Sequence, residues 1–287
     1  MPELPEVDTE RERLAQVLTG RRIASARIDD PRLTRPEDPE LVAAMLTGDR
    51  VDGVERRGKY IVVWLASGRV LLVHLRMTGG FRFAPATHER AVLELDGGAR
   101  VAYRDTRRFG TWLLADRDDV ERILAVKNGP EPLGRGFTTA FLARRLAGRS
   151  APVKAAILDQ RTVAGLGNIY ADEALWHAQV HPLRPAGGLT CDEVAALHRG
   201  VRKALRLGIR RGGATLYDQA YAGGTMQDEF RVYDRDGEPC VRCGALVAKT
   251  RVAGRGTWFC PRCQPGQPQA ASSSPSPPSR SRRRSSA

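Results

Sequence analysis

The sequence predicts an α+β protein built of several parts, and three observations along the chain support this. Residues 21–116 hold aliphatic and β-branched runs separated by turn signals. From Phe137 the apolar spacing becomes helical, and residues 238–264 concentrate four of the five cysteines. We expect an N-terminal helix with a β-rich domain over residues 1–130, a helical domain over 131–232, a metal-binding module over 233–264 and a disordered basic tail over 265–287.

The chain opens with MPELPEV, followed by a helical pattern. Pro5 suits the first turn of a helix, where its missing N–H costs no hydrogen bond. Val7, Leu14 and Leu18 follow at roughly helical spacing, and Gly20 is a plausible stop. A helix start does not explain Pro2.

The next 110 residues contain two predicted hairpins. Residues 59–77 place two Val- and Leu-rich runs around the turn ASGR, and residues 91–105 turn at DGG. The stretch NGPEPLG at 128–134 interrupts the pattern and predicts the domain boundary.

Four helical stretches follow the boundary. One begins near Asn168, after two glycines, and another has Thr190 and Glu193 at capping-box spacing. Residues 137–149 and 152–160 are the other two candidates. The Ser-, Pro- and Arg-rich tail has a composition typical of disorder.

The charge of the chain indicates a phosphate-rich partner. The net charge is +13, and removing the four positive charges of residues 264–287 still leaves +9. No apolar run is long enough to span a membrane and no signal peptide is visible, so we expect a cytoplasmic protein without a membrane partner.

The cysteine spacing predicts a structural metal site. Cys240 and Cys243 form one CxxC knuckle, and Cys260 and Cys263 form a second one sixteen residues further on. Four thiolates on two tight turns complete a tetrahedral zinc site and leave no position for water. We therefore expect one structural Zn²⁺. His177 and His181 have helical i, i+4 spacing, but we interpret them as surface or packing residues.

Four separated stretches together resemble the formamidopyrimidine-DNA glycosylase family of helix-two-turn-helix repair enzymes. They are MPELPEV, HLRMTGG, DTRRFG and GLGNIYADEALWHAQVHP, the last followed by the cysteine module. The resemblance covers roughly residues 2–264. It implies a two-layered β-sandwich behind the first helix, then a helix-two-turn-helix domain and a zinc β-hairpin. It also implies a monomer that binds damaged double-stranded DNA without a small-molecule cofactor and is associated with the nucleoid.

The resemblance assigns chemistry to the start of the chain. Removal of Met1 would leave Pro2 with a secondary amine, and α-amino groups titrate near pH 7.7–8.0, so a usable fraction is neutral. Its bond to the sugar carbon C1′ would be an iminium, which promotes strand cleavage by β,δ-elimination. Glu3 corresponds to the proton donor and Glu6 to a supporting carboxylate.

Further roles follow from the same resemblance. Lys59 corresponds to the acid of the first elimination, and Arg255 to the phosphate-gripping arginine of the second. The DNA-binding positions are His74, Arg76, Arg90, Arg107, Arg149 and Asn168. The residues that fill the gap left by a flipped base are Met77, Arg107 and Phe109. At Asn168 the helix N-terminus is expected to offer backbone N–H groups to a phosphate.

The resemblance indicates removal of oxidised purines, namely 8-oxoguanine and formamidopyrimidines. Residues 216–233 correspond to the family's lesion-capping loop, but they are shorter than usual and lack a Gly-Tyr-Phe stretch. One alternative is therefore an oxidised-pyrimidine glycosylase. A second alternative is a zinc-containing protein that binds DNA damage without catalysis.

Overall fold

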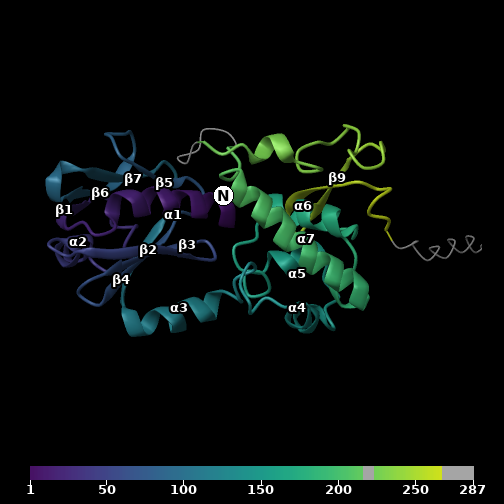
Figure 1. Ribbon diagram of the computed structural model, residues 1–287, viewed down its shortest axis with the longest axis horizontal. Coiled ribbons are helices and arrows are strands. Elements are labelled where there is room, and N and C mark those ends of the chain that lie inside the picture. Colours follow the sequence, from purple (N-terminus) through teal and green to yellow (C-terminus); the bar gives the residue numbers. More distant parts are fainter. Residues whose placement is uncertain (216–222, 267–287) are drawn as a thin grey trace, which may run out of the picture.

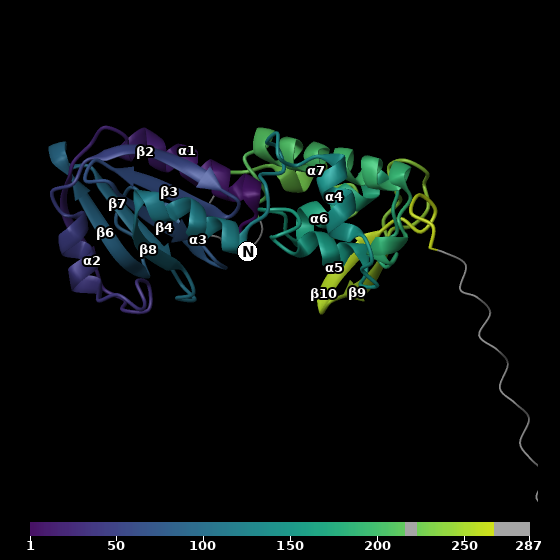
Figure 2. The same ribbon diagram turned by 90° about the horizontal axis from the view of Figure 1, so that it is seen from below.

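Two antiparallel sheets form the N-terminal lobe, and three helices pack against them (Figures 1 and 2). The computed structural model describes residues 1–215 and 223–266. One sheet has the order β1-β6-β7-β5 and the other β2-β3-β4-β8. The strands are β1 (Ile23–Ile28), β2 (Val51–Arg57), β3 (Tyr60–Leu65), β4 (Arg69–His74), β5 (Gly79–Arg82), β6 (Glu89–Leu95), β7 (Arg100–Asp105) and β8 (Thr111–Asp116).

The two predicted hairpins are confirmed as β3–β4 and β6–β7. Alternate residues of β3 face different layers: Ile61 and Val63 lie between the sheets, while Val62 packs on the other side against Val120 and Leu124 of a later helix. This two-sided burial explains why β3 is apolar throughout. After α1 (Leu4–Leu18), this lobe contains two helices that the sequence pattern did not indicate, namely α2 (Pro39–Leu46) and α3 (Val120–Lys127).

The second lobe is helical and carries the zinc hairpin. Its elements are α4 (Thr139–Leu146), α5 (Val153–Leu158), α6 (Asn168–Ala178), α7 (Cys191–Arg210), β9 (Ala248–Val252) and β10 (Arg255–Phe259). Single 3-10 turns occur at Asp96–Gly98, Arg117–Asp119, Ala186–Gly188 and Met226–Glu229. The capping box of Thr190 and Glu193 is confirmed at the start of α7.

The first helix, α1 (Leu4–Leu18), joins the two lobes. Leu4 belongs to the core of the helical lobe, whereas Val7, Leu14 and Leu18 belong to the core of the sandwich. The Leu4 amide also donates to the carbonyl of Gly165, 2.9 Å away. The first turn of the chain is therefore held by the helical lobe, which comes last in the sequence.

Candidate active site

A cleft of about 780 Å³ lies where the two lobes meet, beside the N-terminus. Its lining combines residues from the first turn of the chain, the β2–β3 turn, the loop after β4, the start of α6 and the tip of the zinc hairpin. The predicted site residues that line it are Glu3, Glu6, Lys59, His74, Arg76, Met77, Arg107, Asn168 and Arg255. Residues distant in sequence thus meet in one chamber.

Glu3 is fixed at the N-terminus of α6. Its buried carboxylate accepts hydrogen bonds from the backbone amides of Gly167 and Ile169 at 2.8 Å and of Tyr170 at 3.3 Å. The expectation that these amides await a DNA phosphate is wrong, because the carboxylate already occupies them. A Cβ on Gly167 would lie 2.3 Å from the Glu3 Cδ, so only glycine allows this approach. Burial raises the pKa of Glu3, against the opposing charge of Lys59.

Glu6 links the chain start to the helical lobe. Its carboxylate accepts from the Glu3 amide at 2.8 Å, the Tyr170 hydroxyl at 2.7 Å and the Ala214 amide at 2.8 Å. Burial, and then the neighbouring Glu3 charge, raise the pKa of Glu6 to about 7. Tyr170 was not anticipated from the sequence, although it lies within the motif GLGNIY.

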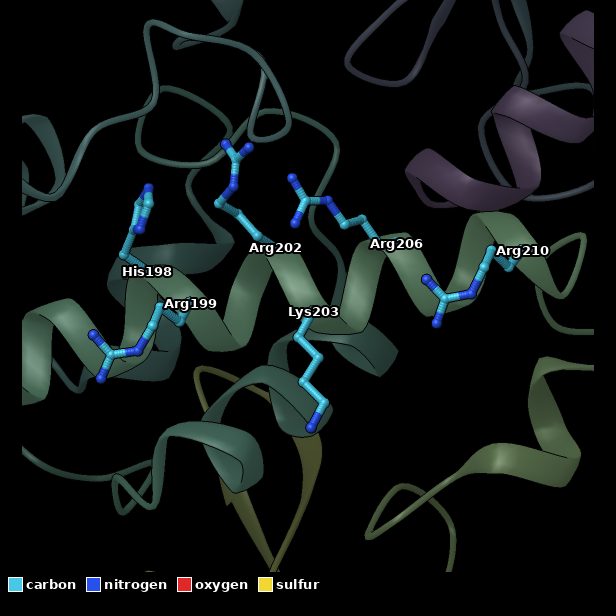
Figure 3. A pocket seen from close by; sticks show the side chains of 6 residues that line it. All are labelled: His198, Arg199, Arg202, Lys203, Arg206 and Arg210. Carbon is cyan, nitrogen blue, oxygen red and sulfur yellow. The ribbon is translucent and has the colours of Figure 1, made fainter.

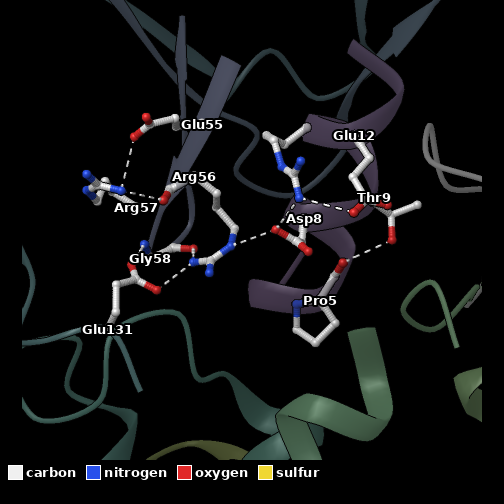
Figure 4. Close-up of polar contacts among 10 residues, drawn as sticks. Pro5, Asp8, Thr9, Glu12, Glu55, Arg56, Arg57, Gly58 and Glu131 are labelled. Atoms are coloured by element: carbon white, nitrogen blue, oxygen red, sulfur yellow. Dashed lines mark hydrogen bonds and ion pairs between the residues drawn. The ribbon is translucent and has the colours of Figure 1, made fainter. Parts of the chain in front are cut away.

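Lys59 is buried in the turn between β2 and β3, directly before β3, and faces Glu3 and Glu6. Burial lowers the pKa of its amine, and the two carboxylates oppose that shift. The turn before it is anchored by Arg56, which bonds Asp8 of α1 at 3.2 Å and Glu131 of the linker at 2.9 Å (Figure 4). Glu131 also accepts from the Gly58 amide. Both lobes therefore hold the segment that carries Lys59.

The N-terminus itself opens into the cleft. Met1 lines the cleft and is 47% exposed, whereas Pro2 is buried. Burial lowers the pKa of the Met1 α-amine, while Glu3 and Glu6 oppose that shift. An amine at this point of the chain is therefore partly desolvated.

Two loops meet above the cleft through Asp105. Its buried carboxylate accepts from the Thr78 hydroxyl, from the Arg107 amide at 3.2 Å and from the Gly110 amide at 2.7 Å. The Thr78 hydroxyl in turn accepts from the Arg107 amide at 3.0 Å. This arrangement joins the loop of Met77 to the loop of Arg107. The position of Asp105 in the motif DTRRFG was a usable signal for this role.

Arg107 and Phe109 form one exposed group on that loop. The Arg107 guanidinium carbon lies 4.9 Å from the centre of the Phe109 ring, and Phe109 is 52% exposed. Phe109 is therefore not a core residue. It is also not among the residues that line the cleft. Met77 is partly exposed and lines the cleft.

The remaining predicted DNA-binding residues divide into two groups. His74 is buried and lies in a T-shaped arrangement with the Tyr60 ring, and its Nδ1 accepts a hydrogen bond from the Arg76 amide at 3.0 Å. Burial, and then the Arg76 charge, lower the pKa of His74 to about 3. Two others lie outside the cleft lining: Arg90 donates to the Asp105 carbonyl, and Arg149 lies 3.6 Å from Asp159.

The four predicted cysteines meet at one point. Their sulfur atoms all lie within 4.8 Å of one another. A Zn–S bond of about 2.3 Å in a tetrahedron requires sulfur separations of about 3.8 Å, so the group fits zinc. The Cys240 sulfur accepts from the Trp176 indole N–H at 3.4 Å, and the Cys260 sulfur from the Cys263 amide at 3.4 Å. Such donors stabilise thiolate charge.

A buried ion pair fixes the zinc hairpin to the helical lobe. Lys154 of α5 lies 2.8 Å from Asp172 of α6, and both side chains are fully buried. The Lys154 ammonium also donates to the Gly256 carbonyl at 3.0 Å and the Thr257 hydroxyl at 2.8 Å, while Asp172 accepts the Trp258 amide. The amide side chain of Asn168 donates to the same Gly256 carbonyl. Nothing in the sequence pattern marked Lys154.

Among residues 1–215 and 223–266, no helix is both long and apolar enough to cross a membrane. The predicted capping loop begins at residue 216, and its residues 216–222 lie outside the described part of the chain. Residues 267–287 of the predicted tail lie outside it too.

Comparison with known proteins agrees with this architecture. Three family descriptions match: the formamidopyrimidine-DNA glycosylase N-terminal domain over residues 1–112, its H2TH domain over 128–220, and the zinc finger found in FPG and IleRS over 237–266. The formamidopyrimidine-DNA glycosylase of Roseiflexus sp. is 47% identical and covers 92% of this chain and 100% of its own.

Solved structures give the same result. The MutM (Fpg) protein from Thermus thermophilus is 42% identical with a TM-score of 0.84, covering 93% of this chain and 100% of its own. The Lactococcus lactis Fpg, solved in complex with abasic-site DNA, is 38% identical with a TM-score of 0.86, covering 92% and 100%. The described sandwich, helical lobe and cysteine cluster, with one structural zinc, correspond to these domains. The chain belongs to the formamidopyrimidine-DNA glycosylase family.

Proposed function

We propose that this protein is a bifunctional DNA glycosylase and abasic-site lyase of base-excision repair that removes oxidised purines from duplex DNA. One observation carries the proposal: the start of the chain, Glu3, Lys59 and Arg255 line a single cleft. Family membership supports the reaction class, and a net charge of +13 suits a polyanionic substrate. Its place of action is then the cytoplasm, on chromosomal DNA of the nucleoid.

Pro2 supplies the nucleophile once Met1 has been removed. The neutral secondary amine attacks C1′, the bond between C1′ and the damaged base breaks, and the base leaves with a proton. Opening of the C1′–O4′ bond gives an iminium between Pro2 and C1′. Loss of a proton from C2′ then expels the 3′ phosphate, and a second elimination expels the 5′ phosphate.

Two buried groups beside the amine serve proton transfer. Glu3, whose pKa is raised by burial, donates the proton to O4′ as the sugar ring opens. Lys59, whose pKa is lowered by burial, exchanges protons during the first elimination. Glu6 holds the Glu3 backbone amide and so positions this segment.

Polar and cationic groups from both lobes hold the strand. His74 and Arg76 lie on the sandwich side of the cleft, and Asn168 and Arg255 on the helical side. Arg255 stabilises the phosphate that leaves in the second elimination. Met77, Arg107 and Phe109 fill the space of the flipped base. Arg90 and Arg149 lie further out, where they would meet flanking phosphates.

Borohydride trapping on an 8-oxoguanine:cytosine duplex tests the nucleophile. Reduction of the iminium by borohydride should leave a covalent protein–DNA adduct whose peptide map begins at Pro2. A blocking N-terminal tag should abolish the adduct, whereas Pro5→Ala in the same segment should preserve it. Mass spectrometry showing Met1 retained on the active protein would refute the assignment.

The lesion class needs its own comparison. Excision should be fastest on 8-oxoguanine and formamidopyrimidine duplexes and slower on an oxidised pyrimidine in the same sequence. The reverse order would indicate the pyrimidine-specific activity. Binding of all of these duplexes without excision of any base would indicate a damage-binding protein.

A further inference from the structure

Helix α7 carries a row of cations on its exposed side. Arg199, Lys203, Arg206 and Arg210, here called the α7 stripe, are all exposed and follow one another at intervals of four, three and four residues. This spacing places their Cα atoms along one side of a helix. In Figure 3 the Arg206 side chain leans toward one edge of that side, and the other three lean toward the opposite edge.

In the described part of the chain, no carboxylate forms an ion pair with a side chain of the α7 stripe. Within residues 1–215 and 223–266, none of its four side chains forms an ion pair or a side-chain hydrogen bond. The stripe, with His198 and Arg202, lines a hollow of about 490 Å³, and no acidic residue of the described chain is among its lining residues. Cations at i and i+4 repel each other and weaken a helix slightly, so the α7 stripe favours an anionic ligand.

Arg202 shows the contrasting case on the same helix. Its guanidinium donates to the carbonyls of Pro132 at 2.9 Å and of Leu133 and Gly134 at 3.3 Å. It therefore fastens the linker between the lobes. The side chains of the α7 stripe make no comparable hydrogen bond with any described residue.

The α7 stripe lies away from the candidate active site. Figure 2 shows α7 along one margin of the helical lobe and the β9–β10 hairpin along the other. Arg255 and Gly256 of that hairpin line the cleft, whereas none of the lining residues found in the described chain belongs to α7. A duplex seated in the cleft would leave the α7 stripe uncovered.

We propose that the α7 stripe binds the phosphate backbone of a second duplex DNA segment while the cleft holds the first. The eleven residue steps from Arg199 to Arg210 rise about 16 Å along the helix, which matches about five base-pair steps along a strand. Arginine forks suit phosphate oxygens. None of the large exposed apolar side chains lies on α7 in the described chain, which disfavours a membrane or an apolar protein surface.

Two simultaneous duplexes provide the test, which rests on the proposed function only for seating the first. The full-length protein is saturated with a short duplex carrying a tetrahydrofuran abasic-site analogue in one colour. Recruitment of an undamaged duplex in a second colour is then measured. The stripe variant combines Arg199→Gln, Lys203→Gln, Arg206→Gln and Arg210→Gln.

A second variant controls for net charge. It combines Arg27→Gln, Arg50→Gln, Arg117→Gln and Arg122→Gln, which are at least half exposed and lie in the sandwich lobe outside the cleft lining. Both variants lose four charges and keep the tail of residues 267–287. The stripe variant alone should bind the second duplex at least about 10-fold more weakly, with a salt dependence shallower by about 3–4 in log–log slope.

The outcomes separate this proposal from the proposed function. Excision from a separate short duplex that carries 8-oxoguanine should be equal in wild type and both variants, and its absence in all three would refute the glycosylase instead. If wild type recruits no second duplex, or if the two variants lose it equally, the α7 stripe is not a DNA site. Binding of poly-glutamate at the stripe, without duplex, would overturn the proposal in favour of an acidic protein partner.

Discussion

Two buried carboxylates, Glu3 at the start of helix α6 and Glu173 within it, each accept hydrogen bonds from backbone amides, but they differ in their access to the cleft. Glu3 accepts three backbone amides at the start of α6, and Glu173 within α6 accepts those of Arg231, Val232 and Tyr233 at 3.0 Å. Burial raises the pKa of both acids. Neither the hydrogen bonding nor the direction of the pKa shift distinguishes a proton donor from a carboxylate that only stabilises the fold. Glu3 lines the cleft and Glu173 does not, and this access to open space is what supports the proposed role of Glu3 as the proton donor.

Substituting each acid by its amide should give the largest difference between the two residues. Glu3→Gln should lower single-turnover base excision by about 10²–10⁴-fold, the usual contribution of general acid catalysis, while the protein still binds lesion DNA. Glu173→Gln is the matched control and should leave excision per folded molecule unchanged. Equal losses in both variants would mean that Glu3 acts only by holding α6.

The ion pair behind the zinc hairpin offers the largest expected effect on stability. Lys154→Met should lower the free energy of unfolding by about 3–5 kcal/mol, because Asp172 would keep a buried charge without its partner. Urea denaturation of the zinc-loaded protein measures this. The double variant Lys154→Met/Asp172→Leu should recover much of the loss, and failure to recover would assign the effect to packing.

Glu6 should make stability depend on pH. Its folded pKa of about 7 exceeds the ordinary value of 4.5, so the folded state binds the proton more tightly than the unfolded state. The stabilisation is therefore complete below about pH 4.5 and is lost as the pH rises toward 7. Comparison of wild type with Glu6→Gln by denaturation should show a difference on the order of 1–3 kcal/mol across this range. Parallel curves would show that the Glu6 pKa is not raised.

The smallest expected effect concerns the loops above the cleft. Thr78→Ala removes the hydroxyl that joins Asp105 to the Arg107 amide. A hydrogen bond of about 0.5–1.5 kcal/mol corresponds to a loss of up to about 10-fold in excision of a paired base. Cleavage at a preformed abasic site should change less, since no base has to be displaced. Thr78→Ser should behave as wild type.

Local patterns predicted much of the fold, and contacts distant in sequence explain what they missed. The hairpins, the capping box at Thr190 and the cysteine cluster all depend on residues within a few positions of one another or on fixed spacing. The sequence pattern did not indicate helix α3 because only two of its residues, Val120 and Leu124, are apolar and buried.

The candidate site shows the same limit. The motifs led to most of the cleft lining, but the partners of those motifs could not be inferred from them. Lys154 carries no local pattern, and its contacts with Asp172 and Thr257 exist only after α5, α6 and the hairpin have assembled. Likewise, Glu3 takes the amides of α6 only because Gly165 and Gly167 admit the first turn of the chain.

The junction between the first turn of α1 and the helical lobe has a consequence for biosynthesis. Glu3 leaves the ribosome 164 residues before Gly167, its partner. At 5–20 residues per second this interval is roughly 8–30 s. During that time the nascent terminus has no docking site and stays open to the peptidase that trims initiator methionine. Under the proposed function, removal of Met1 would therefore precede the closure of the fold around Pro2.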